Sequence, residues 1–236
     1  MMGEPSAPLA LRRLDVQPLG IDLWLVQLDS LPDDDCDVLS AQEYERAARF
    51  VFDRDRRRFL AAHRALRRVL AKFGTRAPGE PFQFSFHGKP YLPPPCACSF
   101  NLSHSGNWAL IGVCEDAAIG VDIELMRNID EIELLAQQHF TAGELNELAA
   151  LKGEDAQRAF LSGWTRKEAC LKALGCGLNL TTTGFEAGLA PLPRALAITL
   201  DGTSMDLELH SVQLGVGLLA SVARVASQSR TTFLER

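Results

Sequence analysis

The chain has 236 residues, of which 47% are hydrophobic and 23% charged, an ordinary globular composition with room for one large domain or two small ones. It contains no apolar run near the roughly 20 residues of a membrane span, and its N-terminal segment lacks the long apolar stretch of a signal peptide. The six cysteines include no C-x-x-C pair, which argues against a zinc site and a disulfide framework. We therefore expect a cytoplasmic protein that is not anchored in a membrane.

The formal charge of −6 is unevenly distributed. Residues 41–76 contain eleven Lys/Arg and four acids, so this segment carries +7 and the remainder −13. Such a division indicates an anionic partner on one side and a cation on the other. We do not expect nucleic acid, because the basic segment lacks the interleaved aromatic residues that stack on bases.

The first part of the chain predicts a strand followed by two helices. Residues 21–28 (IDLWLVQL) are apolar on both faces, as in a buried strand. Ser40 and Glu43 have the spacing of a capping box and predict a helix that runs toward residue 50. A basic amphipathic helix is predicted over residues 56–73, and Gly74 follows it as a stop signal.

Several short strands come next. Phenylalanines alternate in residues 82–86 (FQFSF) and predict a strand, which the Gly88-Lys89-Pro90 turn follows. Residues 99–102 and 108–113 predict two further strands, and residues 119–124 (IGVDIE) a third.

The last part of the chain predicts helices and then strands. Capping-box spacing at 130–133 and 141–144 marks two helix starts. Residues 160–175 (FLSGWTRKEACLKALG) predict a helix that ends at Gly175, and apolar segments from residue 196 onward predict strands. Residues 59–74 and 160–175 align without a gap, which hints at two related lobes.

Acidic residues at two places suggest a cation site. On the helix of residues 160–175, Glu168 lies at the edge of the apolar stripe with Lys172 one turn further on, and a simple i,i+4 ion pair is the plainest interpretation. In IGVDIE, Asp122 and Glu124 share one face of the strand, at roughly 7 Å between Cα atoms. That face could merely be exposed to solvent, but with Glu168 it provides three hard oxygen ligands of the kind that Mg²⁺ accepts.

Anion binding is the second indicated chemistry. The Ser103-His104-Ser105-Gly106 connection between two strands offers backbone N–H groups, hydroxyls and an imidazole, which suit a phosphate. The alternative is an ordinary turn whose histidine is satisfied by its neighbours. Lys89 belongs to a turn of the kind that exposes its lysine in most proteins, and Glu144 is first of all a capping-box residue.

Four motifs in this order resemble the larger, two-lobed 4′-phosphopantetheinyl transferases of the surfactin-synthetase-activating type. They are GKP (88–90), FNLSHSG (100–106), IGVDIE (119–124) and WTRKEACLK (164–172), and the resemblance spans roughly residues 40–180. It implies an α+β monomer of two similar α/β lobes related by pseudo-two-fold symmetry. We place a basic lobe at residues 1–117, on the side of the coenzyme A 3′-phosphate, and a lobe carrying the Mg-binding acids at 118–236.

The resemblance also implies a reaction. Coenzyme A is the substrate and lies between the lobes, where Mg²⁺ held by Asp122, Glu124 and Glu168 binds its diphosphate. A serine of an acidic apo carrier protein attacks the phosphorus that bears the pantetheine arm, which leaves adenosine 3′,5′-bisphosphate. Lys172 stabilises the leaving phosphate. Five residues hold the 3′-phosphate and nearby groups: Arg46, Arg64, Lys89, Ser103 and His104.

Three points stay open at the level of sequence. The catalytic base is Glu168, Glu144 or a metal-bound water, and we favour water or Glu144, because a carboxylate that binds a metal is a poor base. The same acids could serve a Mg-dependent phosphohydrolase or nuclease. A non-catalytic module that binds coenzyme A or a carrier is the third alternative, although such a module would be expected to have lost an acid or Lys172.

Overall fold

The computed structural model describes residues 10–15, 19–31, 38–74, 79–94, 98–177, 180–215 and 217–226. The elements of the first half are β1 (Leu11–Leu14), β2 (Asp22–Gln27), η1 (Leu28–Ser30), α1 (Ala41–Ala47), α2 (Asp53–Ala71), β3 (Gln83–Phe84), β4 (Pro90–Tyr91), β5 (Ser99–Ser105) and β6 (Trp108–Cys114). Those of the second half are β7 (Ile119–Leu125), α3 (Ile132–His139), α4 (Ala142–Ala149), α5 (Gly153–Leu174), η4 (Thr182–Gly184), β8 (Arg194–Leu200), β9 (Thr203–Gln213) and β10 (Leu218–Val225). None of the described helices is long and apolar enough to cross a membrane.

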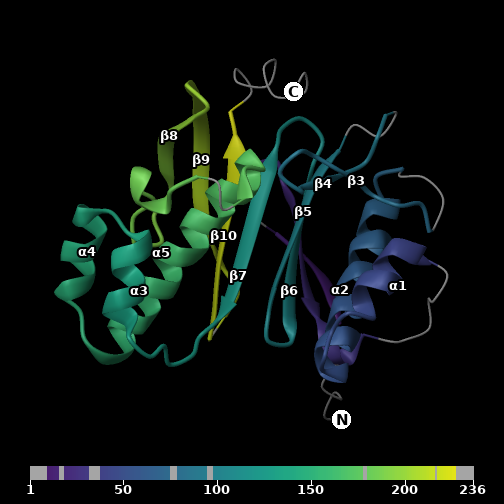
Figure 1. The fold of residues 1–236 in the computed structure, drawn as a ribbon, viewed down its shortest axis with the longest axis horizontal. Helices are drawn as coiled ribbons and strands as arrows, with labels where there is room; N and C mark the ends of the chain where they lie inside the picture. The colour runs from purple at the N-terminus through teal and green to yellow at the C-terminus, as the bar shows by residue number, and fades with distance from the viewer. Residues whose placement is uncertain are drawn as a thin grey trace, which may run out of the picture.

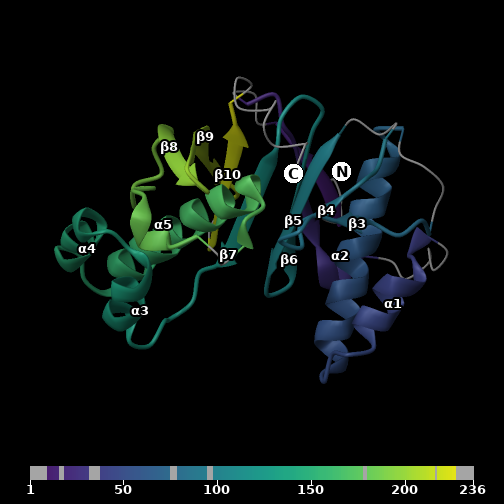
Figure 2. The same ribbon diagram turned by 45° about the horizontal axis from the view of Figure 1, so that its top comes forward.

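Two antiparallel four-stranded sheets form the centre of the molecule. Their strand orders are β1-β2-β6-β5 and β7-β10-β9-β8, so β5 and β7 are both edge strands. The two edges lie side by side at the junction of the sheets (Figure 1, Figure 2). Apolar side chains of β2 and β6 pack against those of β7 and β10, and this shared core joins the halves of the molecule.

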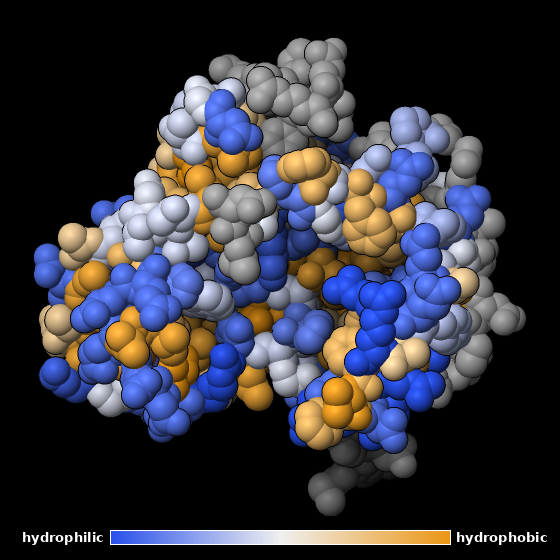
Figure 3. Space-filling model, viewed as in Figure 1, coloured by the Kyte–Doolittle hydropathy of each residue, from blue (hydrophilic) through white to orange (hydrophobic). Residues whose placement is uncertain are grey.

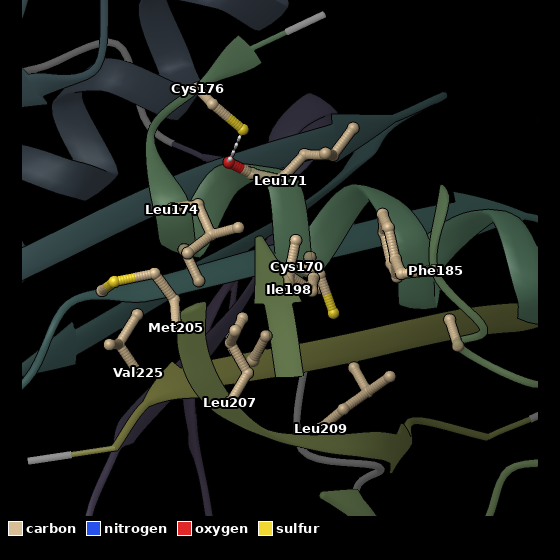
Figure 4. Packing of buried hydrophobic residues seen from close by; sticks show 14 residues of the cluster. Cys170, Leu171, Leu174, Cys176, Phe185, Ile198, Met205, Leu207, Leu209 and Val225 are labelled. Carbon is tan, nitrogen blue, oxygen red and sulfur yellow. Dashed lines mark hydrogen bonds between the residues drawn. The ribbon is translucent and has the colours of Figure 1, made fainter. Parts of the chain in front are cut away.

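A long helix covers the outer face of each sheet (Figure 1). The apolar stripe of α2 packs on β2, β5 and β6, and the end of α5, from Ala169 to Leu174, packs on β8, β9 and β10 (Figure 4). The layers are therefore helix, sheet, sheet and helix, which confirms the predicted α+β fold of two similar lobes. The aligned segments 59–74 and 160–175 fall on α2 and α5, the equivalent helices of the two lobes.

Gly120 allows α5 to approach β7 unusually closely. A Cβ atom on Gly120 would lie 2.1 Å from the Ala169 carbonyl oxygen and 2.3 Å from the Ala173 nitrogen. A larger residue would therefore push the helix away from the strand. This contact sets Asp122, two residues further along β7, next to the last turns of α5.

The two long helices begin earlier than predicted. α2 starts at Asp53 rather than near residue 56, and α5 starts at Gly153 rather than at Phe160. Neither N-cap residue makes a side-chain cap, so the starts carry no local signal. The predicted end of α5 is confirmed, since Gly175 closes it in the left-handed conformation (φ 68°).

Three strand and helix predictions are corrected. The phenylalanine strand shrinks to β3, because Phe82 packs on Phe100 while Phe86 is 94% exposed. β5 continues to Ser105 in register with β6, so the turn is Gly106-Asn107 and not residues 103–106. The start at 130–133 has no capping box, whereas the boxes at 40–43 and 141–144 are present as predicted.

Candidate active site

Side chains of β5, rather than backbone hydrogen bonds, connect its edge to β7. Every second residue of β5 points toward β7, as the period of a strand requires. The contacts are Val121 N to Asn101 Oδ1 at 2.8 Å, Ser103 Oγ to Asp122 Oδ1 at 2.7 Å, and Ser105 Oγ to Glu124 Oε2 at 2.6 Å. The first two of these lie in the buried junction of the lobes, so Asp122 is fixed from both sides.

Lys172 of α5 completes a polar triangle with Asp122 and Ser103. Its Nζ donates to Asp122 Oδ1 at 2.6 Å and to the Ser103 hydroxyl at 3.0 Å. Asp122 is only 4% exposed, and its other oxygen, Oδ2, is buried without a hydrogen-bond partner among the described residues. Burial raises the pKa of Asp122, and the attraction of Lys172 acts against that rise.

Glu168 lies one turn before Lys172 and faces the same group. It is half-buried, and in the described part of the structure its carboxylate has no hydrogen bond or ion pair. Burial raises the pKa of Glu168, the negative charges of Asp122 and Glu124 raise it further, and Lys172 lowers it. Two acids with unused oxygens therefore lie near one another beside a single ammonium.

Glu124 is bound by two other side chains. Its Oε2 accepts hydrogen bonds from Ser105 and from Arg127 at 2.6 Å each. Among the described residues no three Asp, Glu, His or Cys side chains are arranged to hold a metal ion, so the expected convergence of three acids is not observed. The free oxygens of Asp122 and Glu168 still fit Mg²⁺, which typically takes one or two carboxylates and completes its shell with water and phosphate oxygens.

Glu144 does not belong to the site. It is 0% exposed, it closes the capping box with Thr141, and its Oε2 lies 2.9 Å from Lys167 Nζ. Its Oε1 accepts from the backbone N–H groups of Ala187 and Gly188. A carboxylate with all these partners and no access to solvent cannot act as a base on a bound substrate, so this expectation is corrected.

Lys89 also departs from expectation. Its Nζ donates to the carbonyl oxygens of Ile119, Lys172 and Ala173, at 2.7–3.0 Å. An ammonium has three donors, and here all three are used within the protein. Burial of the ammonium lowers the pKa of Lys89 to about 7. In this structure Lys89 therefore has no donor left for a phosphate.

Comparison with known proteins supports the resemblance of the motifs. Residues 118–217 match the family described as the 4′-phosphopantetheinyl transferase superfamily, and residues 33–115 match the 4′-phosphopantetheinyl transferase, N-terminal family. The chain is 40% identical over 165 residues to 4′-phosphopantetheinyl transferase HetI of Nostoc sp., covering 67% of this chain and 70% of that protein. The chain belongs to the 4′-phosphopantetheinyl transferase family. A 4′-phosphopantetheinyl transferase of Bacillus subtilis is 33% identical over 155 residues, 64% of this chain and 67% of the relative.

The other predicted residues of this transferase lie in its first lobe. His104 is exposed and, by the alternation of β5, faces away from the Ser103 side. Partial burial of its ring and the positive charges of Lys172 and His63 lower the pKa of His104. Arg46 is exposed at the end of α1 above the Phe59 ring, and Arg64 is buried on α2.

Three residues around the transferase's acids had no role assigned from sequence: Asn101, Ser105 as the partner of Glu124, and Arg127. The signal for the first two was the alternation in NLSHS, which would have placed Asn101, Ser103 and Ser105 on one face of a strand. It was obscured because Ser103 to Gly106 were interpreted as a turn. Arg127 lies three residues after Glu124 in the segment that follows β7, and the sequence carried no signal for that pair.

Proposed function

We propose that this protein transfers the 4′-phosphopantetheine arm of coenzyme A to a serine of an apo carrier protein, giving the holo carrier and adenosine 3′,5′-bisphosphate. The observation that carries the proposal is the group at the junction of the two lobes. There Lys172 pairs with Asp122, and the free oxygens of Asp122 and Glu168 lie beside them. Two positive groups, a cation held by these acids and the ammonium of Lys172, would together suit a diphosphate.

Asp122 and Glu168 would hold Mg²⁺. Ser105 and Arg127 occupy Oε2 of Glu124, so Glu124 would contribute to the ligand set only through its Oε1. When bound, the ion would neutralise charge on the diphosphate of coenzyme A. Ser103 and Lys172 hold the Asp122 carboxylate in place, whereas for Glu168 the position of the backbone is set by α5. Two unscreened carboxylates close together repel each other, which favours an arrangement with a cation.

The remaining chemistry falls to Lys172 and to the acceptor serine. The serine oxygen forms a bond to the phosphorus that bears the pantetheine arm, and the bond from that phosphorus to the bridging oxygen breaks. Lys172, whose side chain is 27% exposed, can meet the negative charge that develops on the leaving phosphate. With Glu144 buried, the serine proton passes to a water of the site, because Glu168 is engaged with the cation.

The first lobe would recognise the charged ends of both substrates. His104 and the arginines Arg46 and Arg64 would serve the 3′-phosphate, whereas the Ser103 hydroxyl is already used by Asp122 and Lys172. The first turn of α2 exposes Arg54, Arg56 and Arg57, and Figure 3 shows hydrophilic side chains among hydrophobic ones on the side of the molecule where α1 and α2 lie. Such a surface would attract an acidic carrier. We further propose that the protein works as a cytoplasmic monomer.

Intact-mass spectrometry tests this function directly. Apo carriers of fatty-acid, polyketide and peptide synthesis are incubated with the protein, coenzyme A and Mg²⁺, and the added phosphopantetheine mass is measured. We expect the mass gain on at least one carrier and none without Mg²⁺. Consumption of coenzyme A without a carrier would indicate a phosphohydrolase instead, and no change in either molecule would contradict an enzymatic role.

A further inference from the structure

The loop between β3 and β4 projects a lysine across the boundary between the lobes. The loop is closed by its own hydrogen bonds, from Ser85 N to the Lys89 carbonyl and from Gly88 N to the Ser85 carbonyl, both at 2.9 Å. Lys89 extends from this loop to the C-terminal end of α5 and the start of β7. It is therefore a residue of the first lobe whose ammonium is bound entirely by the second.

The three carbonyls that receive Lys89 belong to the two elements that carry the candidate site. Lys172 O and Ala173 O are among the last carbonyls of α5, which have no partner within the helix. A cation there also complements the negative end of the helix dipole. Ile119 O begins β7, three residues before Asp122. One ammonium thus holds the backbone of Lys172 against the strand that carries its ion-pair partner.

The surroundings of Lys89 are shaped for this contact. Gly175 ends α5 with φ 68°, and a Cβ atom there would lie 3.0 Å from Lys89 Cδ. A side chain at this position would therefore crowd the lysine stem, which glycine leaves room for. Cys176 follows directly, and its Sγ caps the Leu171 carbonyl (Figure 4), so the whole helix end is fixed by side chains that follow or cross it.

We propose that Lys89 is a positioning residue, which acts through Lys172 and Asp122 by joining the end of α5 to the start of β7, rather than a ligand of the 3′-phosphate of coenzyme A. The inference rests on the proposed transfer reaction and names the part that this lysine takes in it. A small displacement of a catalytic group lowers the rate of reaction without a matching loss of substrate affinity.

The test compares Lys89→Met and Lys89→Gln with wild type, using coenzyme A and 3′-dephospho-coenzyme A as donors to one apo carrier. Lys152→Met is the matched control, since it removes an exposed lysine at the opposite end of α5. We expect Lys89→Met to lower kcat by about tenfold or more with both donors, with KM changed by less than about twofold. The preference for coenzyme A over the dephospho form should stay that of wild type. A loss of activity with coenzyme A but not with 3′-dephospho-coenzyme A would show that Lys89 binds the 3′-phosphate. Unchanged kinetics with both donors would also overturn the proposal.

Two further measurements separate this idea from a general loss of stability and from failure of the proposed function. In the Lys172→Ala background, Lys89→Met should lower kcat by a much smaller factor than in wild type, because the lysine through which Lys89 acts is gone. If the two substitutions lower kcat independently, so that their free-energy effects add, the proposal is contradicted. Hydrogen exchange of the free protein should become faster at residues 171–176 and 119–122 in both Lys89 variants and stay unchanged in Lys152→Met. This readout needs no turnover, so an inactive wild type would refute the proposed function while exchange still tests Lys89. If Lys89→Met does not fold, Lys89→Gln, which keeps an amide donor, carries both measurements.

Discussion

Asp122 is a buried carboxylate of which, among the described residues, only one oxygen has a hydrogen-bond partner. A buried polar atom without a hydrogen bond typically costs about 1–3 kcal/mol, and an ion pair with Lys172 does not relieve Oδ2. Glu168 adds a second acid, whose carboxylate makes no hydrogen bond or ion pair with the part of the chain that the structure describes. This pair is poorly suited to the stability of the protein alone, and its arrangement is explained if a cation is the missing partner.

Glu168→Gln should abolish transfer while leaving the protein at least as stable as wild type. The amide removes a charge that Asp122 and Glu124 repel, so thermal melting without metal should show no decrease in Tm. Asp122→Ala should also abolish transfer without unfolding the protein. Either variant retaining near-wild-type turnover would remove that residue from the proposed cation site.

Lys172→Ala should lower kcat more than it weakens coenzyme A binding. The proposed charge on the leaving phosphate develops only in the transition state, and removing one such stabilising donor typically costs about 10²–10³ in kcat. Steady-state kinetics and calorimetric titration of coenzyme A give the two quantities. If the variant changes only KM, Lys172 is a binding residue.

His104→Ala should narrow the preference for coenzyme A over its 3′-dephospho form. A hydrogen bond to a charged phosphate contributes about 1.5–3 kcal/mol, so affinity for coenzyme A should fall while affinity for the dephospho form stays nearly constant. Calorimetric titration of both ligands into both proteins completes a double-mutant cycle. Equal losses for the two ligands would exclude contact between His104 and the 3′-phosphate.

At the scale of elements, one acid links α1 to α2 by hydrogen bonds, beside the apolar contacts of Ala47 with Phe59 and Leu60. Glu43 caps its own helix through Ser40 and also accepts hydrogen bonds from His63 and Arg67 of α2. Burial alone would raise the pKa of Glu43, but these hydrogen bonds outweigh it and lower the pKa to about 2. The ionised carboxylate is therefore the stable form in the folded protein.

This arrangement predicts the pH dependence of stability. Because the pKa of Glu43 is depressed on folding, its contribution is present above 4.5, the ordinary value, and is lost as the pH falls toward about 2. Glu43→Gln should lower the free energy of unfolding by about 1–3 kcal/mol at pH 7 and by much less near pH 2. Glu45→Gln, an exposed acid on the same helix, is the control. If Glu43→Gln lowers the free energy of unfolding by the same amount at every pH, the depressed pKa of Glu43 is contradicted.

Elements with a local cause could be predicted from the sequence. The capping boxes at Ser40 and Thr141 need only four consecutive residues, and Gly175 stops α5 by its own backbone conformation. The alternation of residues 82–86 predicted too long a strand, because only Phe82 finds a packing surface and the pairing with β4 covers only Gln83 and Phe84. Strand propensity depends on packing against neighbours, which a local pattern does not show.

The candidate site could be predicted in its membership but not in its contacts. The spacing of the acids and the family resemblance assigned Asp122, Glu168 and Lys172 to one site, and the structure brings these three together. Ser103 was expected to bind a phosphate, and in the structure its hydroxyl donates to Asp122. For Lys89, the family resemblance predicted a phosphate ligand, and the local sequence predicted an exposed turn lysine. Its true partners are carbonyls up to 84 residues away in the chain, and no local pattern encodes such a contact.

At the scale of the whole molecule, positive charge is concentrated in one segment. The part of this segment that the structure describes, residues 41–74, lies on and around α1 and α2 at the outside of the first sheet, whereas the acids of the candidate site lie at the junction. Long-range attraction of this kind changes the rate of association more than the final affinity. The division of the chain at residues 117 and 118 stays a prediction.

The double variant Arg56→Gln/Arg57→Gln should therefore slow the association of an acidic carrier without changing KM for coenzyme A. Both arginines are exposed on α2. Stopped-flow association at increasing salt should show a weaker salt dependence for the variant than for wild type. Arg158→Gln, an exposed arginine of the second lobe, should behave as wild type. An equal effect of both changes would rule out steering by α2.

The side chains between β5 and β7 also bear on how the protein avoids self-association. An open strand edge is a template onto which another chain can add and begin a fibril. Here two such edges face each other, and Asn101, Ser103 and Ser105 fill the space where a foreign strand would bind. If the lobes came apart, both edges would be uncovered at once, together with the apolar faces of β2, β6, β7 and β10 that now pack together. The junction of β5 and β7, where the candidate active site lies, thus also keeps these two strand edges from pairing with another chain.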